Sequence, residues 1–223
     1  MFFQRPFPYA YYNVTLIIVI LNVLVFLLRF FAQNISEAYL SLHDPANNFF
    51  ALVTDPNAFF QRPWTVFTYM FLHANAMHII FNMLALLIFG FIVERKMGSH
   101  EFLLFYLLTG TLSGLLMAFL YPLFGWSGQM VVGASGAISG VLLAYAAFFP
   151  MNKLLIWGII PVRAYILVLG TAAFSVIANI FGIMGNVAHL GHLGGFIFGF
   201  LYFLVRLRIN PIKEFIQARR YSS

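Results

Sequence analysis

Long apolar stretches with almost no charged residues occupy most of this chain and limit what it can fold into. Of its 223 residues, 62% are hydrophobic and only 8% are charged, whereas soluble domains carry about a quarter charged residues. A stretch of about 20 apolar residues can cross a bilayer as a helix. The composition therefore predicts a membrane protein. So little polar sequence remains that we expect a single domain over residues 1–223.

The apolar stretches predict an all-α membrane protein, a bundle of six transmembrane helices. The predicted helices cover Tyr11–Leu28, Met77–Val93, Phe102–Leu123, Gln129–Phe149, Arg163–Phe181 and Ala188–Val205. The longest connection, about Phe30 to Arg62, mixes charged residues with apolar pieces. We expect such a loop to lie in the membrane interface.

The basic residues collect on one side of the predicted bundle. If the N-terminus is inside, all of the 12 Lys and Arg residues except Arg29 and Arg62 fall in inner segments. The positive-inside rule then predicts that both termini are inside, with 206–223 as a basic cytoplasmic tail. Orientation and contact with anionic membrane lipids explain the net charge of +6, so we expect no nucleic-acid partner. The short N-terminal segment has no Arg- and Ser-rich transit pattern, which favours a prokaryotic plasma membrane.

Polar residues of three predicted helices lie at a similar depth below the outer surface. Ser135 and His192 are a few residues into the fourth and sixth helices, roughly 5–10 Å below the helix starts. His78 and Asn82 occupy the matching level of the second helix, on one face because they are four residues apart. Polar groups in a bilayer are costly and usually face a cavity or another polar group. The four side chains are therefore expected to lie near one another.

These residue types complement one another chemically. A Ser hydroxyl is a weak nucleophile until a base accepts its proton, and neutral His is the usual base. All 6 Asp and Glu residues lie in the outer loop or on the inner side, so a Ser135–His192 dyad is expected instead of a triad. Nearby side-chain donors could stabilise an oxyanion. Taken singly, each residue could equally be structural, as part of a small-residue packing surface or a hydrogen bond between helices.

Glycines in the fourth and sixth predicted helices are spaced for close packing. Gly136 and Gly140 are four residues apart, and Gly195 and Gly199 repeat that spacing. Small residues at this spacing allow two membrane helices to approach closely. A close crossing of these helices would bring His192 within hydrogen-bond reach of Ser135.

Three motifs resemble those of the rhomboid intramembrane serine proteases. They are Gly133-Ala134-Ser135-Gly136, the His-x-x-x-x-His-x-x-x-Asn pattern of His73–Asn82, and a His-x-x-Gly-x-x-x-Gly pattern from His192 to Gly199. The resemblance runs from about Trp64 to Phe200 and also includes Glu94-Arg-Lys-Met-Gly98-Ser99.

The resemblance implies a six-helix bundle with a water-filled site that opens outward. It implies that Ser135 is the nucleophile and His192 the base. It further implies that His78, Asn82 and the Ser135 amide form the oxyanion hole. His189 also precedes a glycine-rich turn, but the resemblance assigns it no catalytic role.

The chain departs from the family pattern at two positions. The family often has Trp-Arg in the first outer loop, where this chain has Trp64-Thr65, with Arg62 two residues before the tryptophan. Many bacterial members have an aromatic residue four positions after the nucleophile, where its ring packs on the catalytic His. Here that position is Ser139. The sequence therefore leaves open what orients His192 and what Arg62 does.

These features predict a serine endopeptidase that hydrolyses peptide bonds in or near transmembrane helices, with no metal and no other cofactor. The alternative is a catalytically silent rhomboid-like protein that binds transmembrane clients. A metal or haem site built from the histidines is a weaker alternative, because the chain has no His-Glu-x-x-His motif. A transporter is disfavoured because the polar residues do not form a path across the bilayer. The sequence leaves the substrate, the cleavage preference and the oligomeric state open.

Overall fold

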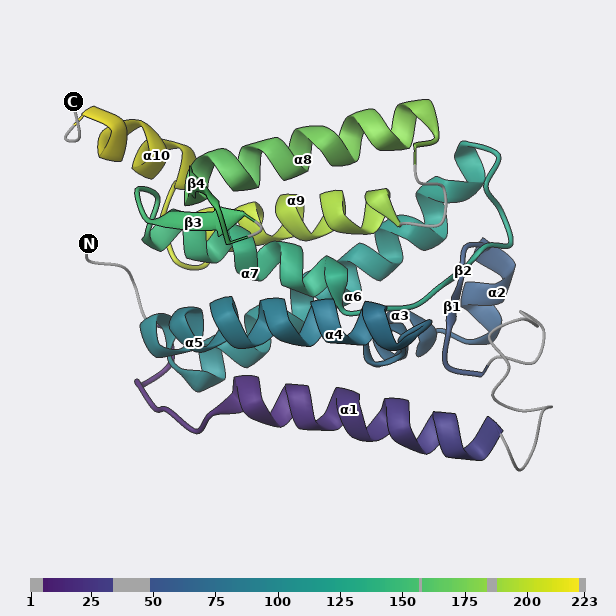
Figure 1. Cartoon of the computed structure of the whole chain (residues 1–223). Helices are drawn as coiled ribbons and strands as arrows, with labels where there is room; N and C mark the ends of the chain where they lie inside the picture. Colours follow the sequence, from purple (N-terminus) through teal and green to yellow (C-terminus); the bar gives the residue numbers. More distant parts are fainter. Residues whose placement is uncertain (1–5, 34–48, 157, 184–187, 221–223) are drawn as a thin grey trace.

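Helices make up most of the chain in the computed structural model, which describes residues 6–33, 49–156, 158–183 and 188–220 (Figure 1). The α-helices are α1 Val14–Gln33, α2 Pro56–Gln61, α3 Thr65–Thr68, α4 Ala76–Ala85, α5 Phe91–Met97, α6 Ser99–Leu123, α7 Ser135–Phe148, α8 Ala164–Phe181, α9 His189–Val205 and α10 Pro211–Arg220. A 3-10 turn, η1 (Tyr69–Phe71), follows α3, and a π-helical turn, η2 (Leu86–Gly90), joins α4 to α5. The prediction of a mostly helical protein is confirmed.

Within the part of the chain that the structure describes, four helical segments are long and apolar enough to cross a membrane. They are Val14–Phe31, Ala76–Met97, Ser99–Leu123 and Ala164–Phe181. α7 and α9 are also apolar but shorter, and each is below the roughly 20 residues that span a bilayer alone. The chain is therefore an integral membrane protein, and the count of six spans stays a prediction.

The shorter helices lie inside the bundle. In Figure 1, α1 and α8 form opposite edges, with α4, α7 and α9 between them. α7 is buried along nearly its whole length, whereas α1 and α8 expose apolar side chains such as Leu24 and Ile177. Exposed apolar helices are stable in lipid, because lipid replaces the protein contacts that a soluble core would need. One hydrophobic cluster runs through the described residues from Ile18 to Phe215.

The predicted fourth helix begins too early. Its first residues form a strand, β2 (Met130–Val131), and a turn, and α7 begins only at Ser135. Ser135 therefore lies at the start of its helix and not a few residues below it. Such non-helical backbone is tolerated at membrane depth where it is buried in protein or lines a water-filled cavity.

Two small antiparallel sheets lie outside the all-α expectation. β1 (Leu52–Val53) pairs with β2, so the outer loop is joined to the segment that leads into α7. β3 (Lys153–Ile156) pairs with β4 (Ile160–Arg163) in a hairpin before α8. These strands have only two to four residues, too few for the alternating pattern that marks a strand in a sequence.

The first long connection is only partly described. Residues 34–48 lie outside the described residues, so the interfacial position of the whole loop stays a prediction. The described part forms β1 and α2, and Asp55 caps α2 by accepting hydrogen bonds from the amides of Asn57 and Ala58 at 2.8 and 3.1 Å. This part of the loop is therefore held in a defined structure.

Glu94, in the middle of α5, caps the N-terminus of α1. Its carboxylate accepts hydrogen bonds from the amides of Val14 and Thr15, at 2.7 and 2.9 Å, and from the Ser99 hydroxyl at 2.5 Å. The first amides of a helix have no partner within the helix. Glu94 supplies that partner, which fixes the start of α1 against the junction of α5 and α6.

Glu101 makes the corresponding connection between α6 and the end of α9. Its carboxylate accepts from the Arg206 guanidinium at 2.6 and 3.1 Å and from the Tyr202 hydroxyl. Glu101 is almost fully buried. The hydrogen bonds that the Arg206 guanidinium donates to this carboxylate raise the pKa of Arg206 above its usual value.

The segment 206–223 is not simply a polar tail. It contains α10, and Pro211 and Phe215 of this helix are buried. The Phe215 ring lies 6.0 Å from the ring of Tyr165 at the start of α8. The cytoplasmic location of this segment stays a prediction.

Candidate active site

Gly133, two residues before Ser135, is at a position where only glycine fits. Gly133 has φ +125°, a conformation that L side chains rarely adopt. A Cβ added there would lie 2.7 Å from Cε1 and Nε2 of His78, closer than real atoms approach. The amide of Gly133 donates to the Tyr69 carbonyl at 3.0 Å. This fixed turn places the His78 ring against the start of α7.

Ser135 is the first residue of α7 and is partly exposed. The residue before it, Ala134, makes no side-chain capping bond. The first amides of a helix point outward without helical partners and carry the positive end of the helix dipole. A negative charge that forms beside the Ser135 hydroxyl would therefore be stabilised by the start of α7.

Backbone contacts of glycine bring α7 and α9 together. A Cβ added at Gly195 would lie 1.9 Å from the carbonyl oxygen of Gly136, and one at Gly199 would lie 3.2 Å from the Gly140 Cα. The two helices are therefore so close at Gly195 that no larger side chain fits between them. His192 lies one turn before Gly195, so it faces the start of α7.

One cavity joins the four polar side chains that the sequence singles out. It has a volume of about 850 Å³ and is lined by Ser135 of α7, His192 of α9, and His78 and Asn82 of α4. Thr171 and Ser175 of α8 also line it. Residues that are more than 50 positions apart in the chain thus contact the same space. Among the described residues, the structure records no hydrogen bond between Ser135 and His192, and such bonds often tighten only when substrate binds.

The hydrogen bonds of α4 set the direction in which His78 donates. Its Nδ1 accepts a long hydrogen bond of 3.4 Å from the Ala74 amide. In a neutral imidazole the proton is then on Nε2, which is the atom that lies against Gly133. His78 therefore presents an N–H donor beside the start of α7.

Asn82 lies one turn further along α4 and is buried. Its Nδ2 donates to the His78 carbonyl at 2.8 Å. An amide NH₂ carries two hydrogens, so a second donor remains for a group in the cavity. The cavity wall therefore offers donors from two residues of α4.

Comparisons with known proteins test the family resemblance that the three motifs suggest. The Rhomboid domain profile matches residues 61–209. The chain belongs to the rhomboid family. The resemblance drawn from the three motifs is thus confirmed.

Named rhomboid proteins from a plant and from bacteria are similar to this chain. RHOMBOID-like protein 1 of Arabidopsis thaliana is 33% identical over 72% of this chain and 39% of its own length. Rhomboid protease GluP of Bacillus subtilis is 33% identical over 61% of this chain and 25% of its own length. Rhomboid protease GlpG of Haemophilus influenzae is 29% identical over 62% of this chain and 69% of its own length. The chain thus matches well under half the length of the first two.

Ser139, which replaces the aromatic residue of many bacterial rhomboids, packs at the crossing of α7 and α9. Its hydroxyl donates to the Ser135 carbonyl at 2.8 Å. A Cβ added at Gly195 would lie 2.8 Å from the Ser139 Cβ. Ser139 thus makes its hydrogen bond within its own helix and contributes to the close crossing.

His189 contacts the ring of His192, a feature that the sequence motifs did not reveal. The two ring centroids are 6.1 Å apart and the rings are nearly perpendicular, at 89°. His189 Nε2 lies 2.9 Å from the Ile183 carbonyl, so this nitrogen carries a proton and donates. The arrangement fixes the His189 ring beside His192.

Arg29 supports the segment that leads into α4. The predicted first helix ended before Arg29, but α1 continues to Gln33 and Arg29 is buried. Its Nη1 donates to the His73 carbonyl at 2.9 Å, and the His73 ring lies 5.1 Å from that of His78. A charged residue in a membrane helix usually has such a partner, and that rule could have marked Arg29 from the sequence.

Arg62 is not among the described residues that line the cavity. Its carbonyl accepts hydrogen bonds from the amide and the hydroxyl of Thr65, at 3.1 and 2.7 Å. This backbone contact joins α2 to α3. The structure assigns the Arg62 side chain no role at the cavity.

Proposed function

We propose that this chain is an intramembrane serine endopeptidase that acts through Ser135 and His192. The observation that carries the proposal is the cavity that Ser135, His192, His78 and Asn82 line together. The similarity to the rhomboid proteases GluP and GlpG supports the same activity. Membership of the rhomboid family supports membrane proteins as the substrates.

In the proposed first step, the Ser135 Oγ attacks the carbonyl carbon of the scissile peptide bond. His192 accepts the hydroxyl proton, which makes the oxygen nucleophilic. The carbonyl oxygen becomes an oxyanion. The donors proposed to stabilise it are the Ser135 amide, Nε2–H of His78 and Nδ2–H of Asn82, all fixed before the charge forms.

In the second step, the tetrahedral intermediate collapses and the C–N bond breaks. His192 returns its proton to the leaving amine, and Ser135 remains esterified to the new carboxyl end. Water then attacks the ester with His192 again as base, which releases the acid and restores Ser135. Among the described residues, no Asp or Glu lines the cavity, so the proposed reaction uses a dyad, with His189 as the group that contacts His192.

The substrate segment must be locally extended. A helical backbone satisfies its carbonyls by internal hydrogen bonds and leaves them inaccessible to a nucleophile. Transmembrane segments with Gly or Pro near the membrane surface unwind at lower cost. These are the expected targets.

The proposed topology has six spans with both termini inside. Three chain segments lie at one end of the bundle, since the Ser99 amide donates to the Ala10 carbonyl at 2.7 Å and Arg206 pairs with Glu101. If the chain crosses the membrane an even number of times between Ala10 and Ser99, and again between Glu101 and Arg206, all three segments lie on the same side. A prokaryotic plasma membrane remains the proposed location, although relatives come from a plant as well as from bacteria.

The test is cleavage of a labelled model transmembrane substrate by the purified protein in liposomes. Ser135→Ala and His192→Ala should each lower the rate by on the order of 10³-fold or more. Ser139→Ala is the matched control, because its hydroxyl already donates within α7, and it should cleave at a rate close to wild type. Unchanged cleavage by Ser135→Ala would refute the assignment.

A serine-directed fluorophosphonate probe separates the protease from a silent client-binding relative. A protease should be labelled in the wild type and Ser139→Ala but not in Ser135→Ala. A silent relative should give no Ser135-dependent label and still retain a crosslinked transmembrane segment. That second result would establish the alternative function.

A further inference from the structure

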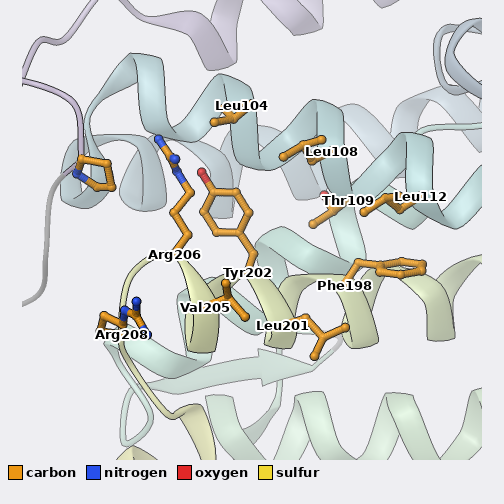
Figure 2. A pocket seen from close by; sticks show the side chains of 11 residues that line it. Leu104, Leu108, Thr109, Leu112, Phe198, Leu201, Tyr202, Val205, Arg206 and Arg208 are labelled. Carbon is orange, nitrogen blue, oxygen red and sulfur yellow. The ribbon is translucent and has the colours of Figure 1, made fainter.

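A groove separate from the Ser135 cavity lies between α6 and α9. Its volume is about 730 Å³, and it shares no lining residue with that cavity. Figure 2 shows leucines of α6 along one wall and side chains of α9 along the other. Arg206 and Arg208 lie together at one end of the groove, where α9 finishes. The groove is therefore apolar along its length and basic at a single end.

The apolar walls are open to the surroundings of the protein. Leu108 is 39% exposed and Leu201 is 45% exposed. In a membrane protein, an exposed apolar wall between two helices is in contact with lipid acyl chains. The groove is thus shaped for an extended hydrocarbon chain.

The positive charge at the end of the groove comes mainly from Arg208. Arg206 is paired with the buried carboxylate of Glu101, so the two charges cancel. Among the described residues, no hydrogen bond or ion pair is recorded for the Arg208 side chain. One net positive charge therefore remains at the end of the groove.

The chain after α9 holds Arg208 in place. Leu207 and Ile209 on either side of it are buried, and the Ile209 amide donates to the Phe203 carbonyl at 2.9 Å. Arg208 has φ +59°, a left-handed conformation that is unfavourable for a residue other than glycine. Its buried neighbours maintain that backbone conformation, which fixes the point at the end of the groove from which the Arg208 side chain extends.

We propose that this groove is a binding site for an anionic phospholipid. One acyl chain lies along the leucines of α6 and α9, and the headgroup phosphate accepts hydrogen bonds from Arg208. An amphiphile with one charged end matches a groove that is charged at one end only. A zwitterionic lipid carries no net charge to pair with the remaining positive charge, so the site prefers an anionic headgroup.

The experiment measures lipid retention by native mass spectrometry of the full-length protein released from mixed micelles. Phosphatidylglycerol and phosphatidylcholine of identical acyl chains are titrated in parallel. The wild type should retain phosphatidylglycerol more strongly, and Arg208→Gln should weaken that retention about fivefold. Lys213→Gln, which removes a basic residue outside the groove lining, is the matched control and should keep the preference.

A second variant tests the acyl-chain part of the site. Leu201→Trp should fill the groove and lower the retention of both lipids, while thermal unfolding verifies that the variant is folded. Glycerophosphoglycerol, the headgroup without acyl chains, should not displace bound phosphatidylglycerol. Displacement by this compound would mean a simple anion site and would overturn the proposal.

Three further outcomes would also overturn it. Arg208→Gln could retain both lipids as the wild type does, or Lys213→Gln could lose as much preference as Arg208→Gln, which would indicate general surface attraction. The spectra could instead contain a dimer that disappears in Leu201→Trp, with lipid retention unchanged. The groove would then be an interface between two copies of this chain.

Discussion

Where α5 meets α6, the buried carboxylates are surrounded by donors, whereas the cavity at the start of α7 contains polar groups with unused hydrogen-bonding capacity. Glu94 accepts three recorded hydrogen bonds. In contrast, the described residues include no hydrogen-bond partner for the Ser135 hydroxyl. A satisfied buried group contributes to stability. A group left unpaired beside a cavity is available to bind or react. The region around Glu94 therefore stabilises the fold, whereas the Ser135 cavity has the properties of a functional site.

The largest expected effect is on activity alone. Ser135→Ala should lower cleavage by on the order of 10³-fold or more, yet change the free energy of unfolding by less than about 1 kcal/mol, because no recorded bond is lost. Cleavage rates and thermal unfolding of the same preparations provide the measurement. A large loss of stability would mean that Ser135 is structural. The Ser135 cavity would then not differ from the region around Glu94.

Glu94→Gln should have the opposite effect. The new NH₂ group would face amides of α1 that need an acceptor, so we expect a loss of about 3 kcal/mol of stability. The cleavage rate per folded molecule should stay near that of wild type. Glu214→Gln removes the same charge from α10, where its side chain makes no recorded hydrogen bond among the described residues, and should cost less than about 0.5 kcal/mol.

Gly195→Ala should lower both the stability of the fold and the rate of cleavage. The added methyl would lie 1.9 Å from the Gly136 carbonyl oxygen, which must push α9 away from α7 at a cost of about 1–3 kcal/mol. The same shift should lower cleavage by moving His192. Gly170→Ala in α8 is the control, since nothing lies within 4 Å there, and it should be stabilising or neutral.

Gly133→Ala tests whether the turn before Ser135 positions His78. The methyl would meet the His78 ring at 2.7 Å, so cleavage should fall about tenfold or more through loss of an oxyanion donor. Gly128→Ala is the control, because Gly128 also has a positive φ, +79°, but nothing lies within 4 Å of an added Cβ. This variant therefore measures the effect of backbone strain alone, without a clash with the His78 ring. Equal losses of activity in both variants would exclude the proposed role of His78 in this turn.

The smallest effect concerns the acid sensitivity of α2. Hydrogen bonds from the Ala58 amide and the Ser127 hydroxyl hold the pKa of Asp55 below its usual value. The stabilisation from its ionised form is present above the unfolded pKa of about 3.9 and is lost as the pH falls through the lower folded pKa. Protection of the Asn57 and Ala58 amides against hydrogen exchange should decrease below about pH 4 in wild type. Asp55→Asn, which caps without titrating, should show no such decrease.

Helix positions could be predicted better than helix ends. The predicted span Phe102–Leu123 falls inside α6, because a continuous apolar run is the direct requirement of a bilayer. The predicted start of the fourth helix is about six residues too early, since residues 129–134 are apolar in composition but form the short strand β2 and a turn. The partner of β2 is β1, from a distant part of the chain, and no local pattern reveals this pairing.

The candidate site, too, could be predicted only in part from the sequence. The sequence alone determined a membrane-embedded helical chain with rhomboid motifs, because hydropathy and the spacing of Ser135, His78, Asn82 and His192 are properties of the linear chain. Only the tertiary structure decided that these side chains line one cavity. This arrangement depends on the close crossing of the glycine backbones of α7 and α9, and contacts between distant segments are not encoded in any one segment.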